Sequence, residues 1–419
     1  MKNKKALYLL LIANAISQFA QGISMLAIPW YFASRLNATS TFSLIYAGAT
    51  FISIFWGLYA GTLIDRFPRK NIFLGICMSS AVAMFSISSI GLITGDIPMF
   101  WIAFAFCFTL LNFNIHYPTL YAFGQEITER HQYRKTNSLL EVMGQAINVL
   151  SGGMAVLLIE GINTNIAGFS IDIEPWSIQK IFFMDGASYL LAMIIIAFIK
   201  YTPTVAKKIS KAPILDRLKE GFTYLKQNPL IFYFGNFSYT VFIFVLIANH
   251  VLWPTYIDQH LGASGDTYAT TRIFYAFGAL FAGFFISKIF RQKSTIYSII
   301  SLMTIALISF LVLAITQDVQ LLLIFSLGLG VANAGIRIQR ITYMFNHIPN
   351  HVIGRTNSVF QSINVFLRAI FLLLFSLTFF SVGSNIIWTF AIAAAAILVS
   401  LFPLIIHYKS LKELKSEMD

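Results

Sequence analysis

The sequence predicts an all-α integral membrane protein, with twelve transmembrane helices in two pseudo-symmetric six-helix bundles. Three observations carry this prediction. Hydrophobic residues make up 57% of the 419 residues and charged residues only 11%, which leaves too little polar surface for a soluble chain. The apolar residues come in blocks of about 20, the length that crosses the hydrocarbon layer as a helix. Short patterns also recur about half a chain apart.

Twelve apolar blocks predict the spans. The first half contains residues 6–33, 41–64, 71–93, 99–124, 138–160 and 179–200. The second half contains residues 230–253, 267–287, 295–315, 319–342, 356–381 and 384–407. The first block is too long for the core of a signal peptide, so we expect an uncleaved first span.

The longest polar connection covers residues 201–229 and is rich in lysine. It separates a predicted N-terminal bundle (1–200) from a predicted C-terminal bundle (230–419). Apolar residues recur at helical spacing within 214–224. This stretch is predicted to be either an amphipathic helix on the membrane surface or a solvated linker helix.

The distribution of positive charge predicts the orientation. When both termini are placed in the cytoplasm, 24 of the 29 Lys and Arg residues lie on that side and three, Arg35, Lys180 and Arg272, on the other. Arg337 and Arg368 lie inside spans. Such an imbalance in short loops follows the positive-inside rule, so the net charge of +12 indicates membrane topology rather than nucleic-acid binding. A bacterial cytoplasmic (inner) membrane is the predicted location.

An internal repeat supports two related halves. Residues 135–138 (Lys-Thr-Asn-Ser) match residues 355–358 (Arg-Thr-Asn-Ser) at an offset of 220, and Asn112 matches Asn333 at an offset of 221. Parallel repeats of this kind place a substrate site between the halves near the membrane midplane.

The most specific motif lies between the second and third spans. It runs Gly61-Thr-Leu-Ile-Asp65-Arg66-Phe-Pro-Arg69-Lys70. A glycine lets two helices approach closely, and an aspartate at a helix end can pair with an arginine or face the positive end of another helix.

This segment resembles the signature G-x-L-x-D-R-x-x-R-K of the major facilitator superfamily, and the span count and half-repeat extend the resemblance over the whole chain. The resemblance implies transport by alternating access. It also implies that Asp65 and Arg69 form a cytoplasmic latch that holds the outward-open state. The counterpart in the second half keeps Gly283 but has Ser287 in place of the aspartate.

A narrower resemblance involves His116-Tyr-Pro118 and residues 354–358. They are similar to the branch that contains macrolide efflux proteins and the enterobactin exporter. Two features depart from that branch. Thr109 stands where it often has a membrane-embedded arginine, and the glycine-rich antiporter motif survives as Gly144 and residues 151–153 without its proline. These departures keep uptake open beside proton-driven export.

Ionisable side chains inside spans are costly and therefore functional candidates. Arg337 and Arg368 would suit an anionic solute in a wet cavity; a structural pair with Glu141 is the alternative. Glu141 is also a candidate for coupling or gating. His116 suits proton handling or packing, and Asp185 is interpreted as structural.

A polar stripe on the span 356–381 is the best candidate for a cavity wall. Gln361, Asn364 and Arg368 share one helical face. The other cavity candidates are Gln18, Gln21, Asn112, His116 and Asn333. Each uncharged residue among them can equally join helices.

The sequence contains no enzyme signature. It has no phosphate-binding loop and no nucleophile elbow, and Cys77 and Cys107 suit neither a disulfide framework nor a metal site. We therefore predict a transporter that works without a cofactor, as a monomer in the lipid bilayer. The leading hypothesis is proton-coupled export of a drug-like or siderophore-like small molecule. The alternatives are uptake of an anionic metabolite or siderophore, and a non-transporting receptor or lipid scramblase.

Overall fold

The computed structural model describes residues 3–129, 132–166, 169–201, 214–349 and 352–414. Its contacts divide the chain into two compact units: unit 1 is Met1–Asn37 with Ile52–Ser210, and unit 2 is Ala38–Phe51 with Lys211–Asp419. Within the described residues, twelve helices are long and apolar enough to cross a membrane. The predicted all-α membrane fold is confirmed, while the predicted bundle boundaries at 200 and 230 stay a prediction.

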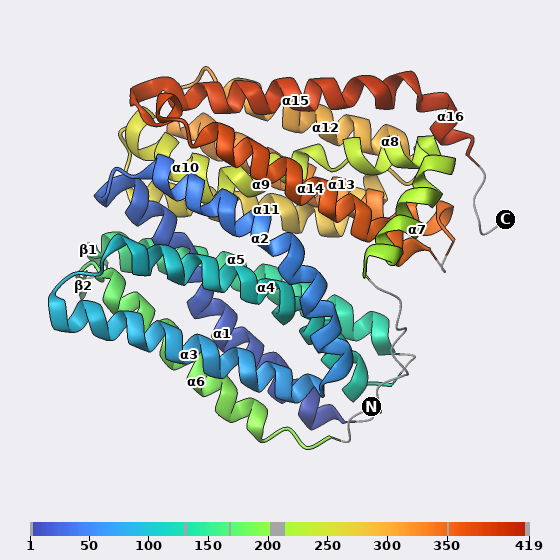
Figure 1. Cartoon of the computed structure of the whole chain (residues 1–419). Coiled ribbons are helices and arrows are strands. Elements are labelled where there is room, and N and C mark those ends of the chain that lie inside the picture. The colour runs from blue at the N-terminus through green and yellow to red at the C-terminus, as the bar shows by residue number, and fades with distance from the viewer. Residues whose placement is uncertain (1–2, 130–131, 167–168, 202–213, 350–351, 415–419) are drawn as a thin grey trace. The chain divides into compact units, whose positions relative to one another are not determined.

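Unit 1 holds the first span, the end of the second span and the third to sixth spans (Figure 1). Its elements are α1 (Lys4–Trp30), η1 (Tyr31–Arg35), the second part of α2 (Thr39–Arg66), α3 (Arg69–Thr94), α4 (Met99–Ile127), α5 (Tyr133–Glu160), β1 (Ile162–Ile166), β2 (Phe169–Ile173) and α6 (Ile178–Ala197). The helices α3 and α6 run side by side, and α1 packs on α6, α5 and α4. The antiparallel β1–β2 hairpin between α5 and α6 was not predicted.

Unit 2 holds the remaining spans. Its elements are α7 (Ile214–Gln227), α8 (Pro229–Phe237), α9 (Thr240–Ile247), η3 (Ala248–Leu252), α10 (Trp253–Thr255), η4 (Tyr256–His260), α11 (Gly265–Ile289), α12 (Thr295–Leu313), α13 (Val319–His347), α14 (Ile353–Phe375), η5 (Thr378–Ser381), η6 (Gly383–Ile386), α15 (Ile387–Ile406) and α16 (Tyr408–Lys412). Helix α13 packs on both α11 and α12, and α12 packs on α15.

The first part of α2 joins unit 2 through a short row of polar contacts. The Thr39 and Thr255 hydroxyls lie 2.9 Å apart, and those of Ser40 and Ser381 lie 2.6 Å apart. Ser43 Oγ donates to the carbonyl of Leu372 at 2.8 Å.

The seventh span differs from the prediction of one helix over 230–253. It extends to His260 and changes geometry on the way, with a break after Phe237 and two π-helical turns, η3 and η4. Two side chains at the break bond back to carbonyls four residues earlier: Asn236 Nδ2, at the end of α8, donates to Phe232 O at 2.8 Å, and Ser238 Oγ, just after α8, donates to Phe234 O at 2.5 Å. Such back-bonding bends helices, and π-helical turns are frequent at functional sites.

Helix α7 confirms that the linker contains a helix near 214–224. It packs on α14, where the approach at Gly221 is close: a Cβ there would lie 2.6 Å from the carbonyl oxygen of Arg355. Glu220 forms an ion pair with Arg355. The remainder of the basic linker, 202–213, lies outside the described residues.

Candidate functional site

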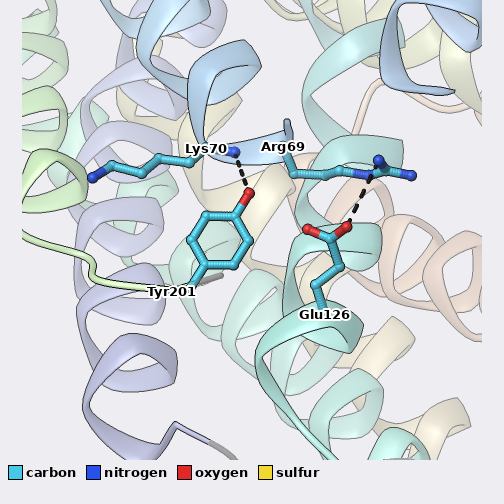
Figure 2. Close-up of polar contacts among 4 residues, drawn as sticks. All are labelled: Arg69, Lys70, Glu126 and Tyr201. Carbon is cyan, nitrogen blue, oxygen red and sulfur yellow. Dashed lines mark hydrogen bonds and ion pairs between the residues drawn. The ribbon is translucent and has the colours of Figure 1, made fainter. Parts of the chain in front are cut away.

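The signature between the second and third spans forms a compact polar cluster within unit 1. Figure 2 shows Arg69, at the start of α3, facing Glu126 near the end of α4, with Arg69 Nη1 and Glu126 Oε1 3.7 Å apart. Tyr201 reaches the same place after α6, and its hydroxyl accepts the backbone N–H of Lys70 at 3.5 Å. Burial raises the pKa of the Tyr201 phenol, which lies beside the carboxylate of Glu126, so the phenol stays neutral at physiological pH.

The Lys70 side chain closes the end of α6. Its ammonium group donates to the carbonyls of Ala197 at 2.8 Å and Ile199 at 2.9 Å. The last carbonyls of a helix lack intrahelical partners and carry the negative end of the helix dipole. The basic motif therefore ties α3 to α6 within unit 1.

We expect Lys70→Met to lower the free energy of unfolding by about 1 kcal/mol, because two carbonyls at a helix end lose a cationic donor. Thermal unfolding of the purified protein in detergent measures the change. Lys412→Met, at an exposed lysine of α16, serves as the control. Equal melting temperatures for the two variants would contradict the capping role.

The predicted partner of this motif, Asp65, lies in α2, but its side chain is outside the described residues. The same holds for Glu141 in α5. The latch and coupling roles of these two residues stay predictions. Glu126, by contrast, was missed by sequence reasoning, although its place just after the fourth apolar block (99–124) was a usable signal.

The other candidates of unit 1 form buried contacts between helices. His116 on α4 meets α1, with its Nε2 at 3.0 Å from Asn14 Oδ1 and at 3.3 Å from Gln18 Nε2. Asn112 Nδ2 donates to Ser80 Oγ on α3 at 3.0 Å. Because these groups satisfy one another, they join helices inside the unit; a cavity role for them stays a prediction.

A carboxyl group lies deeper in the same unit. Asp185 on α6 is fully buried, at 0% exposure. Its polar neighbours are Ser24 on α1 and Tyr189, and Tyr189 in turn lies beside Ser80 and the predicted cavity residue Gln21. Among the residues that the structure describes, no hydrogen bond of normal geometry reaches either carboxylate oxygen of Asp185, and the hydroxyl of Ser24 is its polar contact.

In unit 2, the three residues of the predicted polar stripe on α14 differ in their exposure. Gln361 is exposed, whereas Asn364 is buried. Arg368 is half-buried. Within the described part of the chain, the buried Asn364 Nδ2 and Arg368 Nε atoms have no hydrogen-bond partner.

On α13, Asn333 Nδ2 donates to the hydroxyl of Tyr275 at 2.7 Å, and Arg337 is exposed. Arg340, which the charge count placed on the cytoplasmic side and not among the residues inside spans, is buried. Its guanidinium donates to the carbonyl of Gly235 at 3.2 Å and lies 3.8 Å from the centroid of the Tyr239 ring. Arg340 thus satisfies a carbonyl beside the break between α8 and α9.

Arg272 also lies inside a span. The charge count placed it on the side opposite the termini and did not include it among the residues within spans, but it lies in the second turn of α11, inside the candidate span Gly265–Ile289. Its Nη1 atom is buried, and none of the described residues gives it a hydrogen bond. Its place within the apolar block 267–287 was the signal that sequence reasoning passed over.

Most of the chain, including eleven of these spans in whole or in part, matches a known protein family. The family model of the Major Facilitator Superfamily matches residues 10–372. The chain belongs to this superfamily. It is a transporter and not an enzyme, and the predicted family resemblance is confirmed.

The chain is also similar in sequence to a characterised efflux protein. Macrolide efflux protein A of Streptococcus pyogenes is 21% identical over 281 residues, which cover 67% of this chain and 65% of the relative. The match therefore spans about two thirds of that protein's length.

Solved structures confirm the fold. A mutant form of the nucleoside transporter NupG matches with a TM-score of 0.72 and 11% identity, covering 96% of this chain and 99% of that one. The D-xylose–proton symporter matches with a TM-score of 0.68 and 12% identity, covering 97% and 98%. At such identities the likeness establishes the architecture only.

Proposed function

We propose that this transporter exports amphipathic organic compounds from the cell by secondary active transport, driven by protons moving inward. The observation that carries the proposal is the similarity to a macrolide efflux protein over 281 residues. The sequence contains no nucleotide-binding loop, so an ion or solute gradient is the energy source that remains.

Asp185 is the group proposed to carry the proton. Intramembrane carboxyl groups mark proton relays, because their charge is costly away from water. Asp185 is the fully buried carboxyl of unit 1, and the described residues offer its oxygens no hydrogen bond. A carboxyl held in this way can change protonation when conformational change brings water to it.

The Arg69–Glu126 pair supports alternating access in this proposal. Together with Asp65, it forms the proposed latch that holds one conformation. The proposed setting is a bacterial inner membrane, with a monomeric protein and both termini in the cytoplasm.

The test is accumulation in inside-out membrane vesicles from cells that overproduce the protein, energised to make the interior acidic. A labelled macrolide and a labelled siderophore are the compounds measured. We expect accumulation well above that of vector-only vesicles, and a protonophore should abolish the excess.

Three results would contradict the proposal. Accumulation only in right-side-out vesicles would indicate import, which the relationship to a sugar symporter fold also permits. Movement of fluorescent phospholipid alone, without pH dependence, would indicate a scramblase. An equal signal in vector-only vesicles would exclude export of these compounds.

A further inference from the structure

An open cavity of about 560 Å³ lies between α7 and the start of α14, within unit 2. Val352 and Arg355 line it from the start of α14. The other lining residues share one face of α7, at positions i, i+1, i+4, i+5 and i+8. They are Lys219, Glu220, Thr223, Tyr224 and Gln227. Because nearly all of these side chains are polar or charged, the cavity suits a polar ligand.

The cavity lies where two spans begin. Helix α7 ends at Gln227, just before the candidate span Pro229–His260, and Val352 directly precedes the candidate span Ile353–Phe375. The start of a span marks the boundary between the hydrocarbon layer and the lipid headgroups. Phe222 of α7 is 53% exposed, which suits an aromatic side chain at this boundary. The cavity is therefore at the depth of the phospholipid headgroups.

The two helices that form the cavity are held closely together. A Cβ on Gly221 would lie 2.6 Å from the carbonyl oxygen of Arg355 and 3.1 Å from the backbone nitrogen of Thr356, so main chain meets main chain here. Leu225, one turn further along α7, is fully buried. A site whose walls are already in place loses less free energy to ordering when a ligand binds.

The lining carries charges of both signs. Glu220 forms an ion pair with Arg355. Lys219 lies beside Glu220, and in the described part of the chain no carboxylate pairs with it. A phosphate alone would be attracted by the two cations but repelled by Glu220. A zwitterion that bears both a phosphate and an ammonium group complements all three side chains.

We propose that this cavity binds the headgroup of an ethanolamine phospholipid. The phosphate accepts hydrogen bonds from the Lys219 ammonium and from N–H groups of Arg355 that its ion pair leaves over, and the ethanolamine ammonium donates to Glu220. A glycerol headgroup brings no cation to Glu220, and a choline headgroup has no N–H to donate. The site is separate from the export proposal, because no step of transport was derived from it.

The test is binding of soluble short-chain lipids to the full-length protein in detergent. Dihexanoyl phosphatidylethanolamine is the probe. The phosphatidylglycerol and phosphatidylcholine with the same chains are the matched controls, since they share the phosphate but lack a donating ammonium. Titration of the melting temperature gives an apparent Kd, because a ligand that binds only the folded state stabilises it. We expect the ethanolamine lipid to bind about tenfold more tightly than either control, as one charged hydrogen bond allows.

Lys219→Gln should weaken the binding of all three lipids about tenfold, because it removes a cation from the phosphate that they share. Glu220→Gln should remove the preference for the ethanolamine lipid, so that the three lipids bind alike. Lys226→Gln, at a lysine of α7 outside the lining, should bind as the wild type does. All three residues are exposed, so the ligand-free variants should melt as the wild type does, which also shows that they fold.

Absence of a shift in the wild type, or equal shifts for the three lipids, would overturn the ethanolamine headgroup as the ligand. An undiminished shift in Lys219→Gln would place the binding outside this cavity. Free phosphoethanolamine provides the last comparison: binding as tight as that of the lipid would identify a soluble phosphate ester and overturn the membrane lipid. Because no gradient is applied, these results are independent of the vesicle experiment.

Discussion

Gly278→Ala should lower the free energy of unfolding by about 2–3 kcal/mol, as overpacking of a tightly packed interior does. A Cβ on Gly278 would lie 2.1 Å from the carbonyl oxygen of Leu327 and 3.0 Å from the backbone nitrogen of Val331. These are main-chain atoms of α13, which cannot turn aside as a side chain can. Helices α11 and α13 would have to separate along their contact, and small residues are what permits such an approach in a membrane.

The close approach of α11 and α13 involves a glycine on each helix, so the same loss of stability is expected from a substitution on either side. A Cβ on Gly330 of α13 would lie 2.0 Å from the carbonyl oxygen of Tyr275 on α11, so Gly330→Ala should destabilise the protein to a similar degree. Thermal unfolding in detergent, followed by size-exclusion chromatography, measures both variants.

The same helix provides the control. A Cβ on Gly283 would meet no described atom within 4 Å. Gly283→Ala should therefore be neutral, or stabilise α11 by up to about 1 kcal/mol through its higher helix propensity. Similar losses for Gly278→Ala and Gly283→Ala would show that the close approach does not limit stability.

The fold could be predicted because its causes are local. Blocks of apolar residues mark spans wherever they occur, and twelve of them were recognised. The seventh span shows the limit of this reasoning. Its bends depend on hydrogen bonds from the Asn236 and Ser238 side chains to backbone carbonyls of the same helix. The hydropathy of the sequence does not show whether a polar side chain will form such a bond. The paired close approach of Gly278 and Gly330 likewise depends on which helices become neighbours.

The candidate site was harder to predict, because burial of a charge is decided by packing. Arg340 and Arg337 lie one helical turn apart, yet the first is buried and the second exposed. Arg272 was not counted among the residues inside spans, although it belongs to α11. Asp185 was interpreted as structural from its sequence position alone; in unit 1 it is fully buried, on a helix that packs against α1 and α3.

Asp185→Asn should reduce proton-driven accumulation in inside-out vesicles at least about tenfold, because a missing coupling group removes the driving force rather than the substrate site. The amide has nearly the shape of the protonated carboxylic acid but cannot release a proton. Counterflow, in which labelled substrate exchanges for unlabelled substrate without net proton movement, should continue. Loss of the driven flux together with retained exchange distinguishes coupling from structural damage.

Two controls accompany the measurement. Ser24→Ala removes the polar neighbour on α1 and should preserve pH-driven accumulation, while Asp185→Glu, which retains a titratable group, should keep part of it. Loss of both driven flux and exchange in Asp185→Asn would make Asp185 a structural residue. Accumulation at the wild-type rate would show that the proton enters elsewhere. Only a variant that exchanges substrate without concentrating it supports Asp185 as the group through which the pH gradient acts.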